Sequence, residues 1–306
     1  MSRPNKKDPS LVLSEITWDS IIPPYPDYPY FDGARDYPFR HAETKFDMVN
    51  AWWLIESSTL AYAKEEFVSP RFYNAGLTEV KFFTGNSTQC FVANNEDFAI
   101  IVFRGTELRR RTGATDWSNV IADIEADANI ILTDSGQGGN VHKGFKDALD
   151  EVWKTEGLFQ YISSKDTPNR TIWFTGHSLG AALATLAASR YGKVHGLYTF
   201  GSPRVGDAAF KKNFRINTYR FVNNKDIVTR VPPPILYEHV GNLKYISSDG
   251  IVNDDPSIWD RMTDSKHGEI SRILNSTGLK DRGLVPDYIV DHVPTLYATH
   301  IWNNIL

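Results

Sequence analysis

A serine stands between two glycines at residues 176–180, where the sequence reads Gly-His-Ser-Leu-Gly. The apolar residues Ile172 to Phe174 before it predict a β-strand, and the small residues after it predict a helix. Between a strand and a helix, this pattern is typical of a nucleophile elbow, in which the glycines leave room for a strained turn that exposes the serine Oγ. We therefore predict that Ser178 is the nucleophile of an acyl-transfer reaction. A chance match in an ordinary turn is the alternative, and both flanking elements argue against it.

A serine hydroxyl needs a histidine that removes its proton and a carboxylate that orients this histidine. After a nucleophile elbow, the acid and then the histidine follow along the chain. Asp226 comes shortly after an apolar strand expected at 218–222, so it would project from the carboxyl edge of the sheet, where catalytic groups gather. We predict that Asp226 is the acid. The later acids lie in polar stretches and are expected to be solvated: Asp249, Asp254 and Asp264.

The general base must be one of the histidines after Asp226. His292 follows the strand-like run 288–290 and precedes Pro294, which begins an expected terminal helix, so its loop is held at both ends. We predict that His292 is the base, and His267 is the next candidate. His300 falls inside the expected terminal helix, where a packing or surface role is favoured. The histidines before or beside the serine, His142 and His177, are interpreted as structural supports.

The oxyanion of a tetrahedral intermediate needs hydrogen-bond donors that are placed in advance. The amide of the residue after the nucleophile, Leu179, is one such donor. The second normally comes from the loop after an earlier strand, and here Gly105 and Thr106 follow the apolar run 100–103. We predict that Thr106 and Leu179 form the oxyanion hole. A simple turn capped by the threonine is the alternative.

A helical segment with one apolar face follows Thr106. Trp117, Val120, Ile121 and Ile124 have the spacing i, i+3, i+4 and i+7, which is typical of an amphipathic helix. An ordinary core-facing helix would have the same pattern. Because the segment starts directly after the proposed oxyanion residue, we predict that residues from about 107 to 124 form a lid over Ser178.

The remaining pattern predicts a single type of architecture. Short apolar strands are expected first, and strands then alternate with helices, which implies crossover connections and a mostly parallel central sheet flanked by helices. The expected elements in chain order are a helix at 46–64, strands at 78–83, 89–93, 98–103 and 171–175, a helix at 179–191, a strand at 194–200, a short helix at 207–214 and a strand at 218–222. The fold class is therefore α/β.

Composition limits the classes of function. Hydrophobic residues make up 41% and charged residues 23% of the 306 residues, a balance typical of a globular protein with a large core. The net charge of −4, with interspersed signs, argues against a nucleic-acid partner. The single cysteine, Cys90, lies in an apolar run and is interpreted as a core residue. We predict a proline-rich extension packed on the surface at 1–45 and one domain at 46–306.

The first residues are polar, and no apolar run long enough for a signal peptide or membrane span follows them. This pattern predicts a cytoplasmic protein without a transmembrane segment, although a mature secreted enzyme would look the same.

Several stretches together resemble the class 3, fungal-type lipases of the α/β-hydrolase superfamily. They span most of the chain from about Phe46 onward: residues 102–106, 141–145, 176–180, 201–207 and 226–233, with Asp291 and His292. The resemblance implies the same roles for Ser178, Asp226, His292, Thr106 and Leu179. The segment after Thr106 is longer and more basic than in the fungal members, so the resemblance leaves lid size and substrate preference open.

The leading hypothesis is a serine carboxylic ester hydrolase, a triacylglycerol lipase that works through an acyl-enzyme at a lipid–water interface. It needs no metal or organic cofactor. A phospholipase A1 or a feruloyl-type esterase would use the same triad. A hypothesis of another class is a catalytically inactive lipid-binding protein, against which the complete set of site residues argues.

Overall fold

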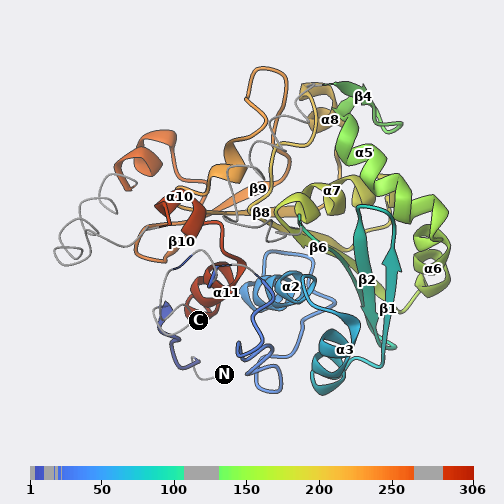
Figure 1. Ribbon diagram of the computed structural model, residues 1–306, viewed down its shortest axis with the longest axis horizontal. Coiled ribbons are helices and arrows are strands. Elements are labelled where there is room, and N and C mark those ends of the chain that lie inside the picture. Colours follow the sequence, from blue (N-terminus) through green and yellow to red (C-terminus); the bar gives the residue numbers. More distant parts are fainter. Residues whose placement is uncertain (1–3, 10–16, 18–19, 22, 107–130, 265–284) are drawn as a thin grey trace.

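The computed structural model describes residues 4–9, 17, 20–21, 23–106, 131–264 and 285–306. The lid segment predicted at 107–124, with Trp117, Val120 and Ile121, lies outside these residues, as does His267. A central eight-stranded sheet runs through the molecule with helices on both faces (Figure 1). The architecture is therefore the α/β fold that the alternating pattern predicts.

The strand order in the sheet is β1-β2-β3-β6-β7-β8-β9-β10. The five strands from β3 to β9 are parallel to one another, whereas β1 and β2 at one edge and β10 at the other pair antiparallel. A separate hairpin joins β4 and β5. The strands are β1 (Glu79–Thr84), β2 (Gln89–Asn94), β3 (Phe98–Phe103), β4 (Leu132–Asp134), β5 (Asn140–His142), β6 (Thr171–His177), β7 (Gly196–Phe200), β8 (Thr218–Asn223), β9 (Asn242–Ile246) and β10 (Val252–Asp254).

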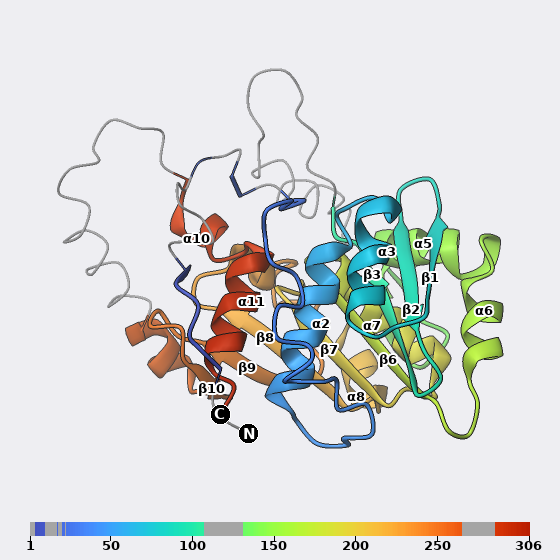
Figure 2. The ribbon, with the colours of Figure 1, turned by 90° about the horizontal axis from the view of Figure 1, so that it is seen from below.

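The helices form two layers, one on each face of the sheet (Figures 1 and 2). Helices α2, α3 and α11 share one hydrophobic core with the sheet, and α5, α6 and α7 share the other. None of the described helices is long and apolar enough to cross a membrane. The helices are α2 (Met48–Leu60), α3 (Glu65–Asn74), α5 (Lys143–Asp150), the π-helical turn η1 (Glu151–Thr155), α6 (Leu158–Lys165), α7 (Leu179–Tyr191), α8 (Ala208–Asn213), the 3₁₀ turn η2 (Ile227–Arg230), α10 (Asp287–Val290) and α11 (Pro294–Asn303).

The central strands are buried on both faces, which explains their composition. Every residue of β3 is buried, and so is every residue of β7. A parallel strand covered by helices on both sides has no solvent face, so its sequence is a continuous apolar run rather than an alternation. Cys90 in β2 is also buried, as expected for a core residue. The apolar runs therefore identify the strands that carry the site at their carboxyl ends.

The helix expected at 46–64 is α2, which begins after the N-cap residue Asp47. The Asp47 carboxylate accepts a hydrogen bond from the amide of Asn50, which satisfies one of the free donors of the first turn. The interpretation of residues 288–290 as strand-like is wrong, because these residues belong to α10. A short apolar run does not distinguish strand from helix, and Pro286 at the N-cap together with the burial of Ile289 and Val290 decides for a helical turn.

The proline-rich segment before α2 contributes to the core, which differs from an extension that lies only on the surface. Its buried aromatic side chains are Tyr28, Phe31, Tyr37 and Phe39. They belong to the same hydrophobic cluster as α2 and α11. The prolines prevent regular secondary structure, but they do not prevent the aromatic residues between them from packing inward. The division into an extension and one domain stays a prediction.

Candidate active site

Ser178 lies on a strained turn between β6 and α7. Its backbone has φ 60° and ψ −132°, a conformation that is rare for a residue with a side chain. Its amide donates to the carbonyl of Phe200 in β7 at 3.0 Å, which anchors the turn to the neighbouring strand. The local geometry is that of the elbow predicted from the sequence.

The two glycines of the elbow are required by close packing. A Cβ atom on Gly176 would lie 2.3 Å from the carbonyl of Gly180, so any larger residue would clash with the first turn of α7. A Cβ atom on Gly180 would lie 2.2 Å from the carbonyl oxygen of Phe103 at the end of β3. The spacing of glycine, serine and glycine therefore reflects the contact between β6, α7 and β3.

The loop that contains Thr106 lies against the same turn. A Cβ atom on Gly105 would lie 2.8 Å from the backbone oxygen of His177, which directly precedes the serine. In parallel register, Phe103 stands opposite Gly176. The end of β3 and the beginning of α7 are therefore neighbours, and Thr106 and Leu179 belong to two segments that meet beside Ser178. Their role as oxyanion donors stays a prediction.

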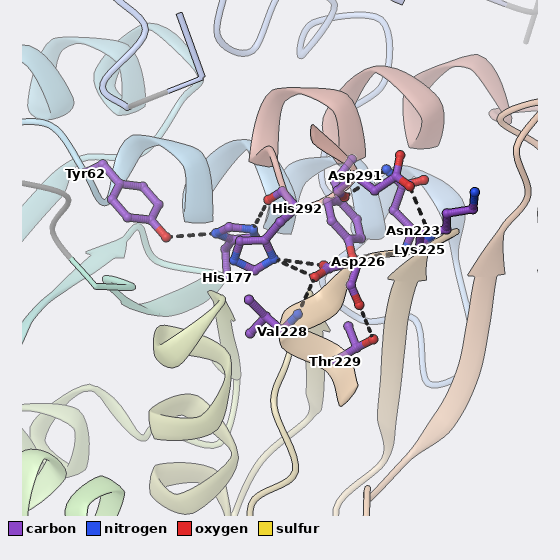
Figure 3. Close-up of polar contacts among 10 residues, drawn as sticks. Tyr62, His177, Asn223, Lys225, Asp226, Val228, Thr229, Asp291 and His292 are labelled. Carbon is purple, nitrogen blue, oxygen red and sulfur yellow. Dashed lines mark hydrogen bonds and ion pairs between the residues drawn. The ribbon is translucent and has the colours of Figure 1, made fainter. Parts of the chain in front are cut away.

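Asp226 follows β8 and is completely buried. Its carboxylate accepts hydrogen bonds from the amide of Val228 at 3.0 Å and from the hydroxyl of Tyr297 at 2.6 Å. It also accepts from Nδ1 of His292, which lies 2.8 Å from Oδ2 and 2.9 Å from Oδ1 (Figure 3). Three donors from three segments thus compensate the burial of this carboxylate.

His292 is also completely buried, in the short connection between α10 and α11. Because the Asp226 carboxylate accepts the hydrogen bond, Nδ1 of the neutral imidazole carries the proton and Nε2 is the basic nitrogen. This is the tautomer that a general base needs in a serine triad. The structure therefore brings together the predicted acid and the predicted base, which are 66 residues apart in the chain.

Two features of this pair were not recognised in the sequence. Gly201, at the end of β7, has φ +59°, and a Cβ atom on it would lie 2.8 Å from Oδ2 of Asp226 and 2.9 Å from Nδ1 of His292. Tyr297 in α11 donates to the acid and accepts from the amide of Asn223 at 2.9 Å. Burial first, and then Asp226, raises the pKa of Tyr297 well above its usual range, so the hydroxyl remains a donor. Gly201 opens the stretch 201–207 that carries the resemblance; for Tyr297 we find no signal in the sequence.

Among the residues that the structure describes, the other candidate histidines have separate environments. His239 bonds through Nε2 to the carbonyl of Thr229 at 2.8 Å. His300 lies in α11, where burial lowers its pKa to about 4. His142 caps α5, because its Nδ1 accepts from the amide of Phe145 at 3.4 Å. Of the described histidines, only His292 is bonded to Asp226.

The three later acids also have roles away from the pair. Asp249 is exposed, and Asp254 forms an ion pair with Lys244. Asp264 is less solvated than expected, since it accepts from the hydroxyl of Tyr245 at 2.8 Å and from Ser248. In the described part of the chain, no group of three or more His, Cys, Asp or Glu residues is arranged to hold a metal ion.

Comparisons with known proteins agree with this geometry. A solved structure titled "A serine protease triad forms the catalytic centre of a triacylglycerol lipase" superimposes with a TM-score of 0.52 and 25% identity, over 67% of this chain and 82% of that chain. The fold is thus that of an α/β-hydrolase. Residues 100–235 match the family described as "Lipase (class 3)". Over this stretch the chain is similar to the class 3 lipases.

Two curated relatives show how far the similarity extends. The chain is 29% identical to "Secreted mono- and diacylglycerol lipase 1" of Fusarium solani over 221 residues, which cover 61% of this chain and 65% of the relative. It is 35% identical to "Lipase" of Rhizomucor miehei over 167 residues, or 50% of this chain and 43% of the relative. The chain thus spans less than two thirds of the length of these relatives.

Proposed function

We propose that the protein is a serine carboxylic ester hydrolase that acts on acylglycerols. The observation that carries this proposal is the buried pair of His292 and Asp226, which lies at the same edge of the sheet as the elbow of Ser178. A binding module has no need for an oriented imidazole or a strained serine. The match of residues 100–235 to the class 3 lipase model and the names of the relatives support the lipid ester as the substrate class.

In the proposed reaction, Ser178 Oγ attacks the ester carbonyl and gives its proton to Nε2 of His292. Asp226 stabilises the imidazolium that forms. The amides of Leu179 and Thr106, with the Thr106 hydroxyl, would bind the oxyanion. The alcohol leaves with the proton from His292, and an acyl-enzyme remains. Water, activated by the same imidazole, then releases the carboxylic acid and restores the serine.

Within this class we propose a triacylglycerol lipase that works at a lipid–water interface. The supporting observation is the solved structure of a triacylglycerol lipase with the same fold. The relative from Fusarium solani, by its name a mono- and diacylglycerol lipase, makes partial glycerides the nearest alternative. The number of acyl chains accepted is therefore the property to measure.

The test is labelling by a fluorophosphonate probe together with hydrolysis of tri-, di- and monoacylglycerols, a phospholipid and a feruloyl ester. Wild type should be labelled and should hydrolyse triacylglycerol fastest, whereas Ser178→Ala should show neither reaction. Ser164→Ala, at an exposed serine of α6, is the matched control and should behave as wild type. Folded wild type that binds lipid vesicles but takes no label would mean an inactive lipid-binding protein. Preference for the phospholipid or the feruloyl ester would overturn the substrate class alone.

A further inference from the structure

His177 connects Tyr62 to the loop of the base. Its Nδ1 lies 2.8 Å from the hydroxyl of Tyr62, which follows α2, and its Nε2 lies 2.8 Å from the backbone oxygen of His292 (Figure 3). His177 is almost completely buried. A single imidazole therefore spans from the end of α2 to the backbone of the histidine that we propose as the base.

The two contacts define the tautomer of His177. The backbone oxygen of His292 can only accept a hydrogen bond, so Nε2 of His177 must donate. Nδ1 then carries a lone pair, and the hydroxyl of Tyr62 donates to it. Burial, and next the neighbouring His292, lower the pKa of His177 well below its usual value, so the ring is neutral at physiological pH.

Neutrality of His177 matters because its ring packs on the ring of His292. The two ring centroids are 4.4 Å apart. In the proposed reaction His292 becomes an imidazolium, and a second positive charge at this separation would oppose its formation. A donor on Nδ1 favours the neutral form of His177, since a protonated Nδ1 could no longer accept from the hydroxyl.

The Tyr62–His177 pair also contacts the loop of Thr106. A Cβ atom on Gly105 would lie 2.1 Å from the hydroxyl oxygen of Tyr62 and 2.8 Å from the backbone oxygen of His177. The pair thus lies between the proposed oxyanion loop and the proposed base. A second side chain holds the same base loop, because Nδ2 of Asn223 donates to the carbonyl of Asp291 at 3.0 Å.

We propose that Tyr62 is a positioning residue that acts through His177: its hydroxyl holds the neutral Nε2–H tautomer, and this tautomer holds the carbonyl of His292. The backbone of the base, and hence the direction of its imidazole, is then set from α2 as well as by Asp226. This inference rests on the proposed ester hydrolysis. Without the hydroxyl, the Nδ1–H tautomer would turn a lone pair on Nε2 toward the His292 oxygen and lose the contact.

Tyr62→Phe removes only the hydroxyl and keeps the ring. We expect kcat for a soluble short-chain ester to fall about tenfold, the effect of one hydrogen bond in the transition state. KM should stay near that of wild type, because Tyr62 acts on the base and not on the substrate. Tyr73→Phe, at an exposed tyrosine of α3, is the matched control and should leave kcat unchanged.

A double-mutant cycle separates positioning from packing. In a His177→Leu background there is no tautomer to hold, so Tyr62→Phe should cost almost nothing further, whereas a packing role would cost the same in both backgrounds. Nitrogen NMR of the wild-type protein should show His177 with its proton on Nε2, and Tyr62→Phe should weaken this preference. Thermal unfolding of each variant shows that it is folded.

The outcomes distinguish this inference from the function on which it rests. Active wild type with an equally active Tyr62→Phe variant, an additive cycle, or a proton on Nδ1 of His177 would overturn the positioning role and leave the hydrolase intact. Wild type that neither hydrolyses esters nor takes the fluorophosphonate label would overturn the hydrolase, and the positioning role with it.

Discussion

Tyr297 provides the clearest test of how the buried acid is held. Tyr297→Phe removes a hydroxyl that makes two hydrogen bonds in the core: it donates to Oδ2 of Asp226 at 2.6 Å and accepts from the amide of Asn223 at 2.9 Å. The aromatic ring is completely buried and would keep its packing. The substitution therefore isolates the contribution of one hydroxyl to the stability of the acid loop.

Two losses determine how far Tyr297→Phe lowers the free energy of unfolding. A hydrogen bond to a buried charged group contributes about 1.5–3 kcal/mol, and a buried amide left without an acceptor costs about 1–3 kcal/mol. The two bonds share one oxygen atom, so their effects are not additive. We expect the free energy of unfolding to fall by about 3 kcal/mol.

The measurement is denaturant unfolding of wild type and Tyr297→Phe at neutral pH. Tyr288→Phe in α10 is the matched control, because Tyr288 is 43% exposed and its loss should change stability by less than about 0.5 kcal/mol. The variant should also take a fluorophosphonate label about tenfold more slowly, since one hydrogen bond to the carboxylate of the proposed acid is gone. A loss of stability no larger than that of the control would refute the view that the hydroxyl holds Asp226.

Three further substitutions test other parts of the site. Thr106→Val should lower kcat by about 10²-fold with little change in KM, whereas Thr106→Ser should keep most activity; equally small effects would exclude the hydroxyl as an oxyanion donor. Gly180→Ala would place a Cβ atom 2.2 Å from the Phe103 oxygen, so we expect a loss of about 3 kcal/mol in unfolding free energy, and an unchanged melting temperature would contradict the packing of α7 on β3. Burial lowers the pKa of His300 from 6.5 to about 4. As pH falls, the unfolded state therefore takes up a proton at this histidine near pH 6.5, and the folded state does so only near pH 4. Neutral His300 contributes to the free energy of unfolding above pH 6.5, and about 3 kcal/mol of this contribution is lost as pH falls from 6.5 to 4. His300→Gln should make stability less dependent on pH in this window. A stability curve parallel to that of wild type would refute the assignment.

The sequence by itself identified the strands and helices that carry the site. Continuous apolar runs mark β3 and β7 because these strands are buried on both faces, and α7 has the bounds that its small residues predict. The pattern around Ser178 was also readable, because the strand, the turn and the helix are consecutive and the clash that Gly176 avoids is with the first turn of that helix; the clash that Gly180 avoids, with the Phe103 carbonyl of β3, is seen only in the fold. Local sequence therefore sufficed where local geometry decides.

The pairing of Asp226 with His292 is a different case. Chain order and the position of a loop after a strand singled out both residues, but only the fold places their side chains 2.8 Å apart. Where local pattern was ambiguous, the prediction failed: the short apolar run at 288–290 is helical, and the aromatic residues of the proline-rich segment pack into the core. In both places, contacts with distant residues decide the outcome.

The sequence indicated a structural role for His177 but not the contacts that support the pair. Four residues support the pair, and they meet because the strands are parallel and their carboxyl ends share one edge of the sheet. They lie after α2, in β6, after β7 and in α11: Tyr62, His177, Gly201 and Tyr297. From the local sequence, a helical tyrosine that donates a hydrogen bond to a buried carboxylate cannot be distinguished from one that only packs in the core. The strained turn at Ser178 is thus encoded by consecutive residues, whereas the environment that orients the proposed base and acid exists only when four distant segments are folded together.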